Sequence, residues 1–205
     1  MVSYVSFDLE TTGFSPYANE IIQIGAWKVK DEVVVDKFDT YVKPIQYIPR
    51  EVQALTGITP EMVSCYPSID EILPEFFEFC EDLPFLGHNL QFDYSFLLVK
   101  GNDIGVDFSL GKTRQGIDTL KLSKRFFPNF PKHSLEYLVE RFKILDGGTG
   151  FHNASNDAYM TKLVYDRFLY NSKTVVGSRL PELLDGGKSN SRYGKVENNG
   201  TLSFN

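Results

Sequence analysis

The sequence contains little cysteine and no long hydrophobic run. Its two cysteines, Cys65 and Cys80, lack the spacing of a metal-binding motif, and two thiols cannot supply a disulfide framework. We therefore expect both to be reduced and buried. No apolar run approaches the roughly 18 residues of a membrane-spanning helix. The first residues, MVSYVSFDLE, lack the basic and apolar regions of a secretory signal. These absences predict a cytoplasmic protein that makes no membrane contact.

Positive charge and histidine are also scarce. The chain has 21 Lys and Arg against 27 Asp and Glu, which gives a formal net charge of -6 and an isoelectric point of about 5.1. This balance argues against a general nucleic-acid coat protein, because such a protein needs many cationic contacts to phosphate. The three histidines, His88, His133 and His152, would all be consumed by a single three-histidine zinc site. A zinc site of that kind is therefore not expected.

The sequence does contain enough apolar and aromatic residues for a packed core. Apolar residues make up 42% of the chain and aromatic residues 14%, which is more than a disordered chain carries. The length suits one domain with a tail. From about residue 172 the composition shifts toward glycine, serine and asparagine, as in GGKSNSRYGKVENNG, which leaves little to bury. We predict one domain at residues 1–171 and a flexible C-terminal tail at 172–205.

Strand patterns come first along the chain, and helical patterns follow. Residues 2–9, 21–29 and 33–42 alternate or are rich in β-forming residues, and they are expected to form an antiparallel meander. This succession of strands and then helices predicts an α/β domain with a mixed central sheet and helices on both sides. Helices are expected at 49–55, 59–63, 69–81, 92–100, 118–126, 133–142 and 156–170, with one short strand at 84–88.

Two carboxylates stand near the end of the first predicted strand, in SFDLETTGF. Asp8 and Glu10 are two residues apart, so their side chains point to the same face of a strand. The two like charges repel each other, and the arrangement is stable only with full solvation or with a cation between them. Asp93, in GHNLQFDYSFL, and Asp157, in HNASNDAYM, each stand at the start of a predicted helix. All four acids could therefore converge on one cleft.

Each of these acids also has a purely structural interpretation, since Asp and Glu are common as helix caps and in the first turn of a helix. For any single acid, that interpretation is the more frequent one. The conjunction of four carboxylates favours a shared metal site. Carboxylate oxygens without thiolate and with little imidazole favour Mg²⁺ or Mn²⁺ over Zn²⁺.

The segments DLETTG, LTGIT, HNLQFD and HNASND, in this order, resemble the motifs of the DEDD family of 3′→5′ exonucleases. Within that family the chain resembles most the proofreading epsilon subunits of bacterial DNA polymerase III, over roughly residues 1–170. The resemblance implies a ribonuclease H-like fold. The family divides by a histidine five positions before the last aspartate or a tyrosine four positions before it. Those positions hold His152 and Asn153 here, so the chain resembles the histidine branch.

The resemblance implies roles for the four acids and for one histidine. Asp8, Glu10, Asp93 and Asp157 would be the catalytic acids that bind two Mg²⁺ or Mn²⁺ ions, with Asp8 bridging both. Glu10 and Asp157 would bind the ion on the side of the attacking water, and Asp93 would act through the second ion. His152, whose ordinary pKa is about 6.5, would be the general base.

Further residues are expected to contact the terminal nucleotide. Thr12 and the amides around Gly13 could bind the terminal 3′-OH, so that the site recognises a strand end. Leu55 could wedge against the last base, or it could pack within its own helix. The full set of candidates is Thr11, Thr12, Gly13, Glu51, Leu55, Thr56 and Asn89. His88 is expected to organise the cleft rather than to transfer protons.

The acidic net charge does not exclude a nucleic-acid substrate. Two bound divalent ions would add +4 to -6 and leave -2. Local basic residues such as Lys121, Lys124 and Arg125 would then supply the remaining attraction for phosphate. Because an enzyme that holds a few nucleotides needs few phosphate contacts, tight binding to long duplexes is not expected.

The last residues, NGTLSFN, carry a second resemblance. Residues 199–204 resemble the six-residue peptides that bind sliding clamps, with Leu202 and Phe204 as apolar anchors and Asn199 in place of the usual glutamine. This pattern predicts a sliding clamp or a DNA polymerase as partner. The alternative is a disordered end that happens to contain leucine and phenylalanine.

Three functions stay open at this point. The first is a 3′→5′ exonuclease that releases nucleoside monophosphates from single-stranded DNA 3′ ends, in proofreading or end trimming. The second is a 3′→5′ exoribonuclease resembling ribonuclease T or oligoribonuclease, because the motifs do not read the 2′-OH. The third is a non-catalytic nucleic-acid-binding scaffold, which the five intact catalytic positions disfavour. The motifs favour the first.

Overall fold

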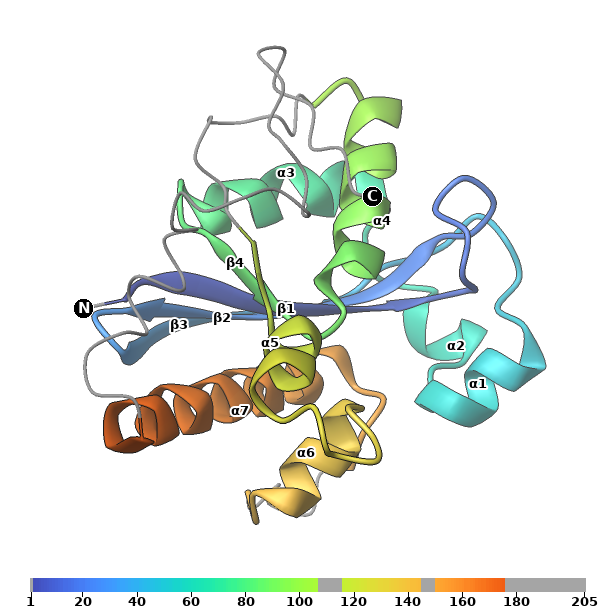
Figure 1. Cartoon of the computed structure of the whole chain (residues 1–205). Helices are drawn as coiled ribbons and strands as arrows, with labels where there is room; N and C mark the ends of the chain where they lie inside the picture. The colour runs from blue at the N-terminus through green and yellow to red at the C-terminus, as the bar shows by residue number, and fades with distance from the viewer. Residues whose placement is uncertain (1, 107–115, 145–149, 176–205) are drawn as a thin grey trace.

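The computed structural model describes residues 2–106, 116–144 and 150–175, which form a five-stranded mixed sheet with helices on both faces (Figure 1). The strand order is β3-β2-β1-β4-β5. The first three strands form an antiparallel meander, and β4 and β5 run parallel to β1. The predicted architecture is confirmed. The strands are β1 (Tyr4–Thr11), β2 (Ile21–Lys30), β3 (Val33–Tyr41), β4 (Phe85–Gly87) and β5 (Gly116–Asp118).

The helices divide between the two faces of the sheet. In Figure 1, α3 and α4 lie on one face, α5, α6 and α7 lie on the other, and α1 and α2 lie beyond one end of the strands. None of the helices in the described residues combines the length and the apolar character of a membrane span. The helices are α1 (Arg50–Thr56), α2 (Pro60–Val63), α3 (Ile69–Cys80), α4 (Leu90–Asp103), α5 (Thr119–Phe126), α6 (Leu135–Arg141) and α7 (Ala154–Val175).

The alternation in β1 separates the hydrophobic core from the polar face of the strand. Val5, Phe7 and Leu9 pack in one cluster with residues of α3 and α4. Phe7 and Phe85, for example, meet edge to face with ring centroids 4.9 Å apart. Ser6 points the other way and donates a hydrogen bond to the Ala158 carbonyl of α7, at 2.7 Å. Because side chains alternate along a strand, the residues that follow Ser6 at intervals of two also face α7.

The start of α7 lies directly against β2. Gly25 has no side chain, and a Cβ at this position would overlap the backbone of Ala154 and Ser155. The Trp27 indole N–H donates to the Ser155 carbonyl at 2.8 Å, and the Gln23 amide oxygen accepts from the Ala154 N–H at 3.2 Å. The absence of a side chain at Gly25 thus permits the approach of α7, and two hydrogen bonds hold it.

Several expectations need correction. The strand β5 was not predicted, because three residues that include Gly116 show no periodicity and pair only with β4. Cys65 is exposed, whereas Cys80 is buried in the core as expected, and both are free thiols. Helix α7 continues through Val175, so the first residues assigned to the tail are helical. Residues 176–205 lie outside the described residues, and the flexible tail stays a prediction.

Replacing Gly25 with alanine tests the close approach of α7. Gly25→Ala should lower the free energy of unfolding by about 1–3 kcal/mol, because the new methyl group forces the α7 backbone away from β2. The measurement is urea denaturation of the variant and the wild type.

The matched control is Gly57→Ala, whose Cβ meets open space and whose cost comes only from a φ of 73°. Gly57→Ala should leave α7 in place, so its Mn²⁺ affinity should match that of the wild type. In Gly25→Ala, where α7 is displaced, the Mn²⁺ affinity should fall. Equal stability and equal Mn²⁺ affinity in Gly25→Ala and the wild type would show that the contact does not position α7.

Candidate metal centre

Three carboxylates from two elements meet on the α7 side of the sheet. Asp8 and Glu10 follow Ser6 on β1, and Asp157 lies in the first turn of α7. One ligand atom of each residue lies within 4.8 Å of those of the other two. Glu10 and Asp157 are buried, and Asp8 is partly buried. The packing of α7 on β2 therefore brings an acid from late in the sequence to the two acids of β1.

Asp93 reaches the same region from α4. Its side chain is buried, and its Oδ1 accepts a hydrogen bond from the Leu9 N–H at 3.2 Å, between the two acids of β1. Strand β4 pairs with β1 only as far as Ser6. The N–H of Leu9, further along β1, is therefore available to the Asp93 side chain. Asp93 is not one of the three acids whose ligand atoms cluster within 4.8 Å. It stands beside that group and contributes charge to it.

Burial and mutual repulsion make these acids hard to ionise. Burial, followed by the charges of Asp157 and Asp93, raises the pKa of Glu10 to about 8. Burial also raises the pKa of Asp93 to about 8 and that of Asp157 to about 6. The pKa of Asp8 is raised well above its ordinary value by burial and by all three neighbouring acids. The cluster is therefore unfavourable unless protons or cations bind to it.

A divalent ion fits the cluster better than a cationic side chain does. In the described part of the chain, no lysine or arginine forms an ion pair with any of the four acids. The buried Oδ1 of Asp157 has no hydrogen-bond partner among these residues. Carboxylate oxygens are the ligands that Mg²⁺ and Mn²⁺ prefer. The orphaned oxygen and the unneutralised charge both indicate a site for hard divalent cations.

His152 is linked to the cluster through its backbone. The residue precedes α7 in a left-handed conformation, with a φ of 65°, and its N–H donates to Asp157 Oδ2 at 3.1 Å. The ring Nε2 lies 3.6 Å from Glu136 Oε1 in the first turn of α6. Sequence analysis missed Glu136, because a glutamate in the first turn of a surface helix is a common and uninformative pattern.

A second polar network holds the start of α4 to the start of α5. Asp118, the buried N-cap of α5, accepts from the Asn89 N–H at 3.1 Å and from two amides of its own helix. His88 Nδ1 lies 2.9 Å from Thr119 Oγ1, and burial lowers the pKa of His88 to about 4. The His88 ring is thus partly buried and neutral near pH 7, and its organising role stays a prediction. Sequence analysis placed Asp118 within the predicted helix 118–126, whereas the structure shows it as the cap that precedes α5.

The hydroxyls of Thr11, the last residue of β1, and of Thr12, the next residue, both form local hydrogen bonds. Thr11 Oγ1 donates to the Gly13 carbonyl at 2.7 Å, and Thr12 Oγ1 accepts from the Glu20 N–H at 3.0 Å. A Cβ at Gly13 would crowd the Asn19 side chain. The Thr12 hydroxyl keeps its own proton to donate, whereas the Thr11 hydroxyl already donates inside the loop. Thr12 is buried, however, and the expected ligand contacts of both threonines stay predictions.

The candidates on α1 differ in what they expose. The Leu55 side chain is 57% exposed, so it is not packed within its helix as the structural interpretation required. Glu51 is also exposed. Thr56 Oγ1 donates to the Val52 carbonyl at 2.9 Å and accepts from the Ile58 N–H at 3.1 Å. The Thr56 hydroxyl is therefore used at the end of the helix, which Gly57 caps, and its expected role in substrate contact finds no support in these hydrogen bonds.

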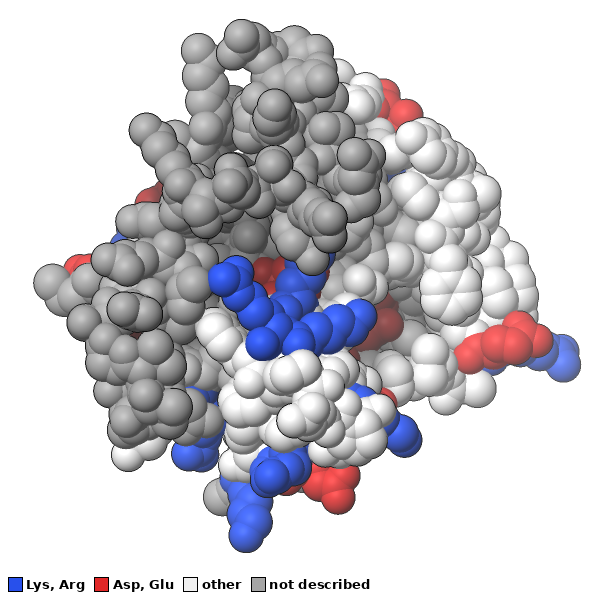
Figure 2. Space-filling model, in the orientation of Figure 1, with Lys and Arg blue, Asp and Glu red and all other residues white. Residues whose placement is uncertain are grey.

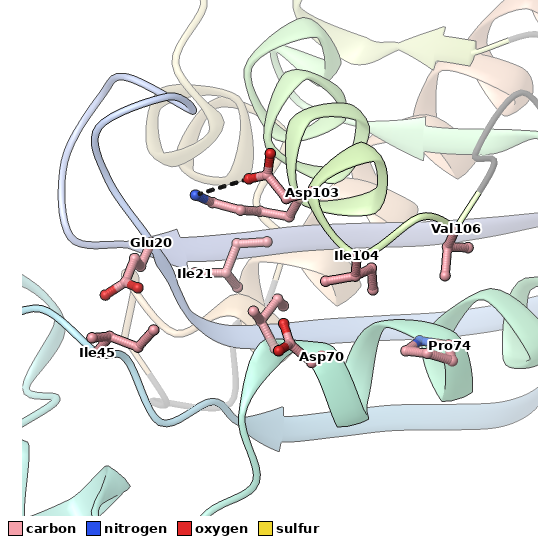
Figure 3. A pocket seen from close by; sticks show the side chains of 10 residues that line it. Glu20, Ile21, Ile45, Asp70, Pro74, Asp103, Ile104 and Val106 are labelled. Atoms are coloured by element: carbon pink, nitrogen blue, oxygen red, sulfur yellow. Dashed lines mark ion pairs between the residues drawn. The ribbon is translucent and has the colours of Figure 1, made fainter.

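The acidic cluster is separate from a larger pocket near the ends of α3 and α4. That pocket has a volume of about 500 Å³ and includes Glu20, Asp70 and Asp103 in its wall (Figure 3). Lys100 Nζ lies 3.9 Å from Asp103 Oδ2 at its rim. None of the four motif acids lines it. The acidic cluster is thus not part of this cavity.

The chain is similar to known exonucleases and polymerase components. A family model described as an exonuclease matches residues 5–165. The PolC-type DNA polymerase III of Thermotoga petrophila is 38% identical over 182 residues, which cover 88% of this chain but only 13% of that protein. The DNA polymerase III subunit epsilon of Aquifex aeolicus is 35% identical over 168 residues, which cover 82% of this chain and 80% of the subunit.

A solved structure shares the fold at low sequence identity. E. coli exonuclease I in complex with a dT13 oligonucleotide matches with a TM-score of 0.73 and 19% identity, over 91% of this chain and 43% of that chain. This similarity confirms the predicted ribonuclease H-like fold.

The crowding of the acids predicts how stability depends on pH. In the folded protein Glu10 and Asp157 have a raised pKa, so they hold protons that the unfolded chain has lost above about pH 5. Their contribution to stability is present below that pH and is lost as the pH rises through the raised values. In EDTA, the melting temperature should therefore fall between about pH 5 and about pH 8.

Asp8→Asn removes one charge from the cluster, so in EDTA it should raise the melting temperature near pH 8 and flatten its pH dependence. Asp82→Asn, which removes an exposed acid remote from the cluster, should do neither. A melting temperature that rises with pH, or an Asp8→Asn variant that melts lower than the wild type, would contradict the crowding.

Proposed function

Because the chain belongs to the exonuclease family, we propose that it hydrolyses single-stranded DNA from the 3′ end and releases nucleoside monophosphates. The observation that carries this proposal is the cluster of Asp8, Glu10 and Asp157, whose charges no described cationic side chain neutralises. The relatives named DNA polymerase III and the oligonucleotide bound to E. coli exonuclease I support DNA as the substrate. Proofreading and end trimming are the two roles that fit this reaction.

The acids would hold two divalent ions, Mg²⁺ or Mn²⁺. Asp8, Glu10 and Asp157 supply three ligands, and Asp93 supplies a fourth carboxylate from the other side of β1. When bound, such ions lower the pKa of water and stabilise the charge that develops on the phosphate and on the leaving 3′ oxygen. The ions also supply the charge that the four acids need in order to ionise together.

We assign to His152 the role of accepting the proton of the attacking water. Its backbone is anchored to Asp157, and its ring remains 41% exposed, so the ring can reach a substrate without unfolding α7. Glu136 faces the ring nitrogen and can stabilise the imidazolium that forms. In this assignment Glu136 positions His152 and does not itself touch the substrate.

The end of the strand would be recognised by the loop after β1 and by α1. Thr12 and the amides around Gly13 are proposed to bind the 3′-OH, and the exposed Leu55 is proposed to contact the last base. Phe14 is 90% exposed. Its ring meets the ring of Phe92, the residue that precedes Asp93, edge to face with centroids 6.4 Å apart. Phe14 is therefore a second exposed apolar residue, and it packs against the first turn of α4.

The proposal is tested with 3′-labelled single strands of DNA and RNA of equal sequence, incubated with Mg²⁺, Mn²⁺ or EDTA. We expect metal-dependent release of labelled mononucleotides, faster from DNA. A faster rate on RNA would select an exoribonuclease instead. Strand binding without release of product would leave a non-catalytic scaffold.

Single substitutions test the assigned roles. Asp157→Ala should abolish cleavage with the fold retained, because it removes a metal ligand, and His152→Ala should lower kcat by about 10²–10⁴-fold. The measurements are steady-state rates and circular dichroism, with Asp82→Ala as a matched surface control. Full activity of Asp157→Ala would show that the metal assignment is wrong.

We also propose that residues 199–204 bind a DNA sliding clamp or its polymerase. This segment lies outside the described residues, so the proposal rests on its sequence alone. A fluorescent peptide of residues 195–205, titrated with purified bacterial clamp, should bind with micromolar affinity, and the Leu202→Ala, Phe204→Ala peptide should not. Equal binding of the two peptides, or none by either at about 1 mM clamp, removes this proposal.

A further inference from the structure

The chain is acidic overall, yet one segment beside the metal centre is purely basic. From Thr119 to Leu135 the sequence has four basic residues and no acidic one, within a chain of net charge -6. Helix α5 carries three of the four, Lys121, Lys124 and Arg125, and all three are exposed. Figure 2 shows Lys and Arg side chains gathered at the middle of the face in view, over the position of α5.

The rotation of α5 is set by small polar residues on its inner side. Thr119 and Ser123 are fully buried, one turn apart, and each contacts a histidine. Thr119 Oγ1 lies 2.9 Å from His88 Nδ1, and Ser123 Oγ lies 2.7 Å from His133 Nδ1. These contacts turn the basic residues outward, because positions 121, 124 and 125 lie away from 119 and 123 on a helix. The cationic face is thus held in place rather than left to a mobile helix.

Helix α5 also begins next to the start of α4. Its N-cap, Asp118, accepts a hydrogen bond from Asn89, which precedes α4 and its Asp93. The charge of Asp118 raises the pKa of Asp93, and the charge of Lys124 contributes to the low pKa of His88. Both ends of this short helix therefore lie within electrostatic reach of the motif that supplies Asp93.

Two of the charges on α5 are available to a ligand. The third, that of Lys121, lies 3.9 Å from Oδ2 of the buried Asp118 and so already has a partner. Lys124 and Arg125 form no ion pair within the described ranges, 2–106, 116–144 and 150–175. The three side chains span about 6 Å of helix, which allows contact with one or two phosphates.

We propose that the outer face of α5 binds the phosphate backbone of a single strand, upstream of the 3′ nucleotide in the metal centre. This inference rests on the proposed exonuclease function. Bound ions neutralise the acids only at the metal centre. The phosphates upstream of the 3′ nucleotide therefore still meet an acidic protein and need cations of their own. Backbone contact is independent of base sequence, which suits an enzyme that must accept every 3′ end.

The test compares a long substrate with a short one. The variant Lys121→Gln, Lys124→Gln, Arg125→Gln and the wild type are assayed on dT12 and on the dinucleotide dTpdT, which has no upstream phosphate, in Mg²⁺ at several salt concentrations. We expect the ratio of kcat/KM for dT12 to that for dTpdT to fall about tenfold in the variant. Because both rates come from the same preparation, loss of folded protein cancels in this ratio.

The salt dependence and rU12 give two further readings. The slope of log kcat/KM for dT12 against log salt should become shallower by about 0.7–1.4, as expected for one or two lost phosphate contacts on a single strand. The ratio measured with rU12 and its dinucleotide should fall by a similar factor, because a backbone contact does not read the sugar.

A matched variant carries the same charge change away from the site. Lys30→Gln, Lys37→Gln, Arg167→Gln alters exposed residues of β2, β3 and the later part of α7, and it should keep the wild-type ratio. If both triple variants lower the ratio equally, or if neither does, the α5 surface is not the phosphate contact, and the exonuclease proposal still stands. If the wild type cleaves neither substrate, both proposals fail.

Discussion

Repulsion among buried carboxylates is the constraint on which the rest of this structure depends. Besides burial, the charges of Asp93, Glu10 and Asp157 raise the pKa of Asp8. The charges of Asp157 and Asp93 likewise add to the effect of burial on the pKa of Glu10. A fold that only needed stability would separate them or give each a lysine or arginine. The described residues do neither, so the free energy that the cluster costs has to be offset by something that binds to it.

The sheet and its helices are arranged to maintain that crowding. Gly25 lets the backbone of α7 lie against β2, and this contact carries Asp157 to the acids of β1. Asp93 is held through the free amide of Leu9, and Asp118 ties the loop before α4 to the start of α5. Acids, a histidine and a basic helix thus come from distant parts of the sequence and are fixed by backbone contacts, which tolerate little movement.

The sequence allowed prediction of what depends on local pattern. The alternation of β1 placed Asp8 and Glu10 on one face, and helix-start signals placed Asp93 and Asp157 at the beginnings of α4 and α7. Features that depend on tertiary contact could not be found in this way. No periodic pattern in the sequence indicates the pairing of β5 with β4 or the contact between Glu136 and His152. The same holds for the internal hydrogen bonds of the Thr56 hydroxyl. Thr56 fitted a substrate role by position, and only its two hydrogen bonds reveal that it ends a helix.

The central claim is that these acids are gathered to hold paired divalent ions, and anomalous scattering from crystals grown with Mn²⁺ measures this most directly. The account predicts two manganese peaks among the carboxylates of Asp8, Glu10, Asp93 and Asp157, and their loss in crystals of the Asp157→Ala variant. Manganese bound only elsewhere on the protein, with the four carboxylates left protonated or paired to side chains, would contradict it.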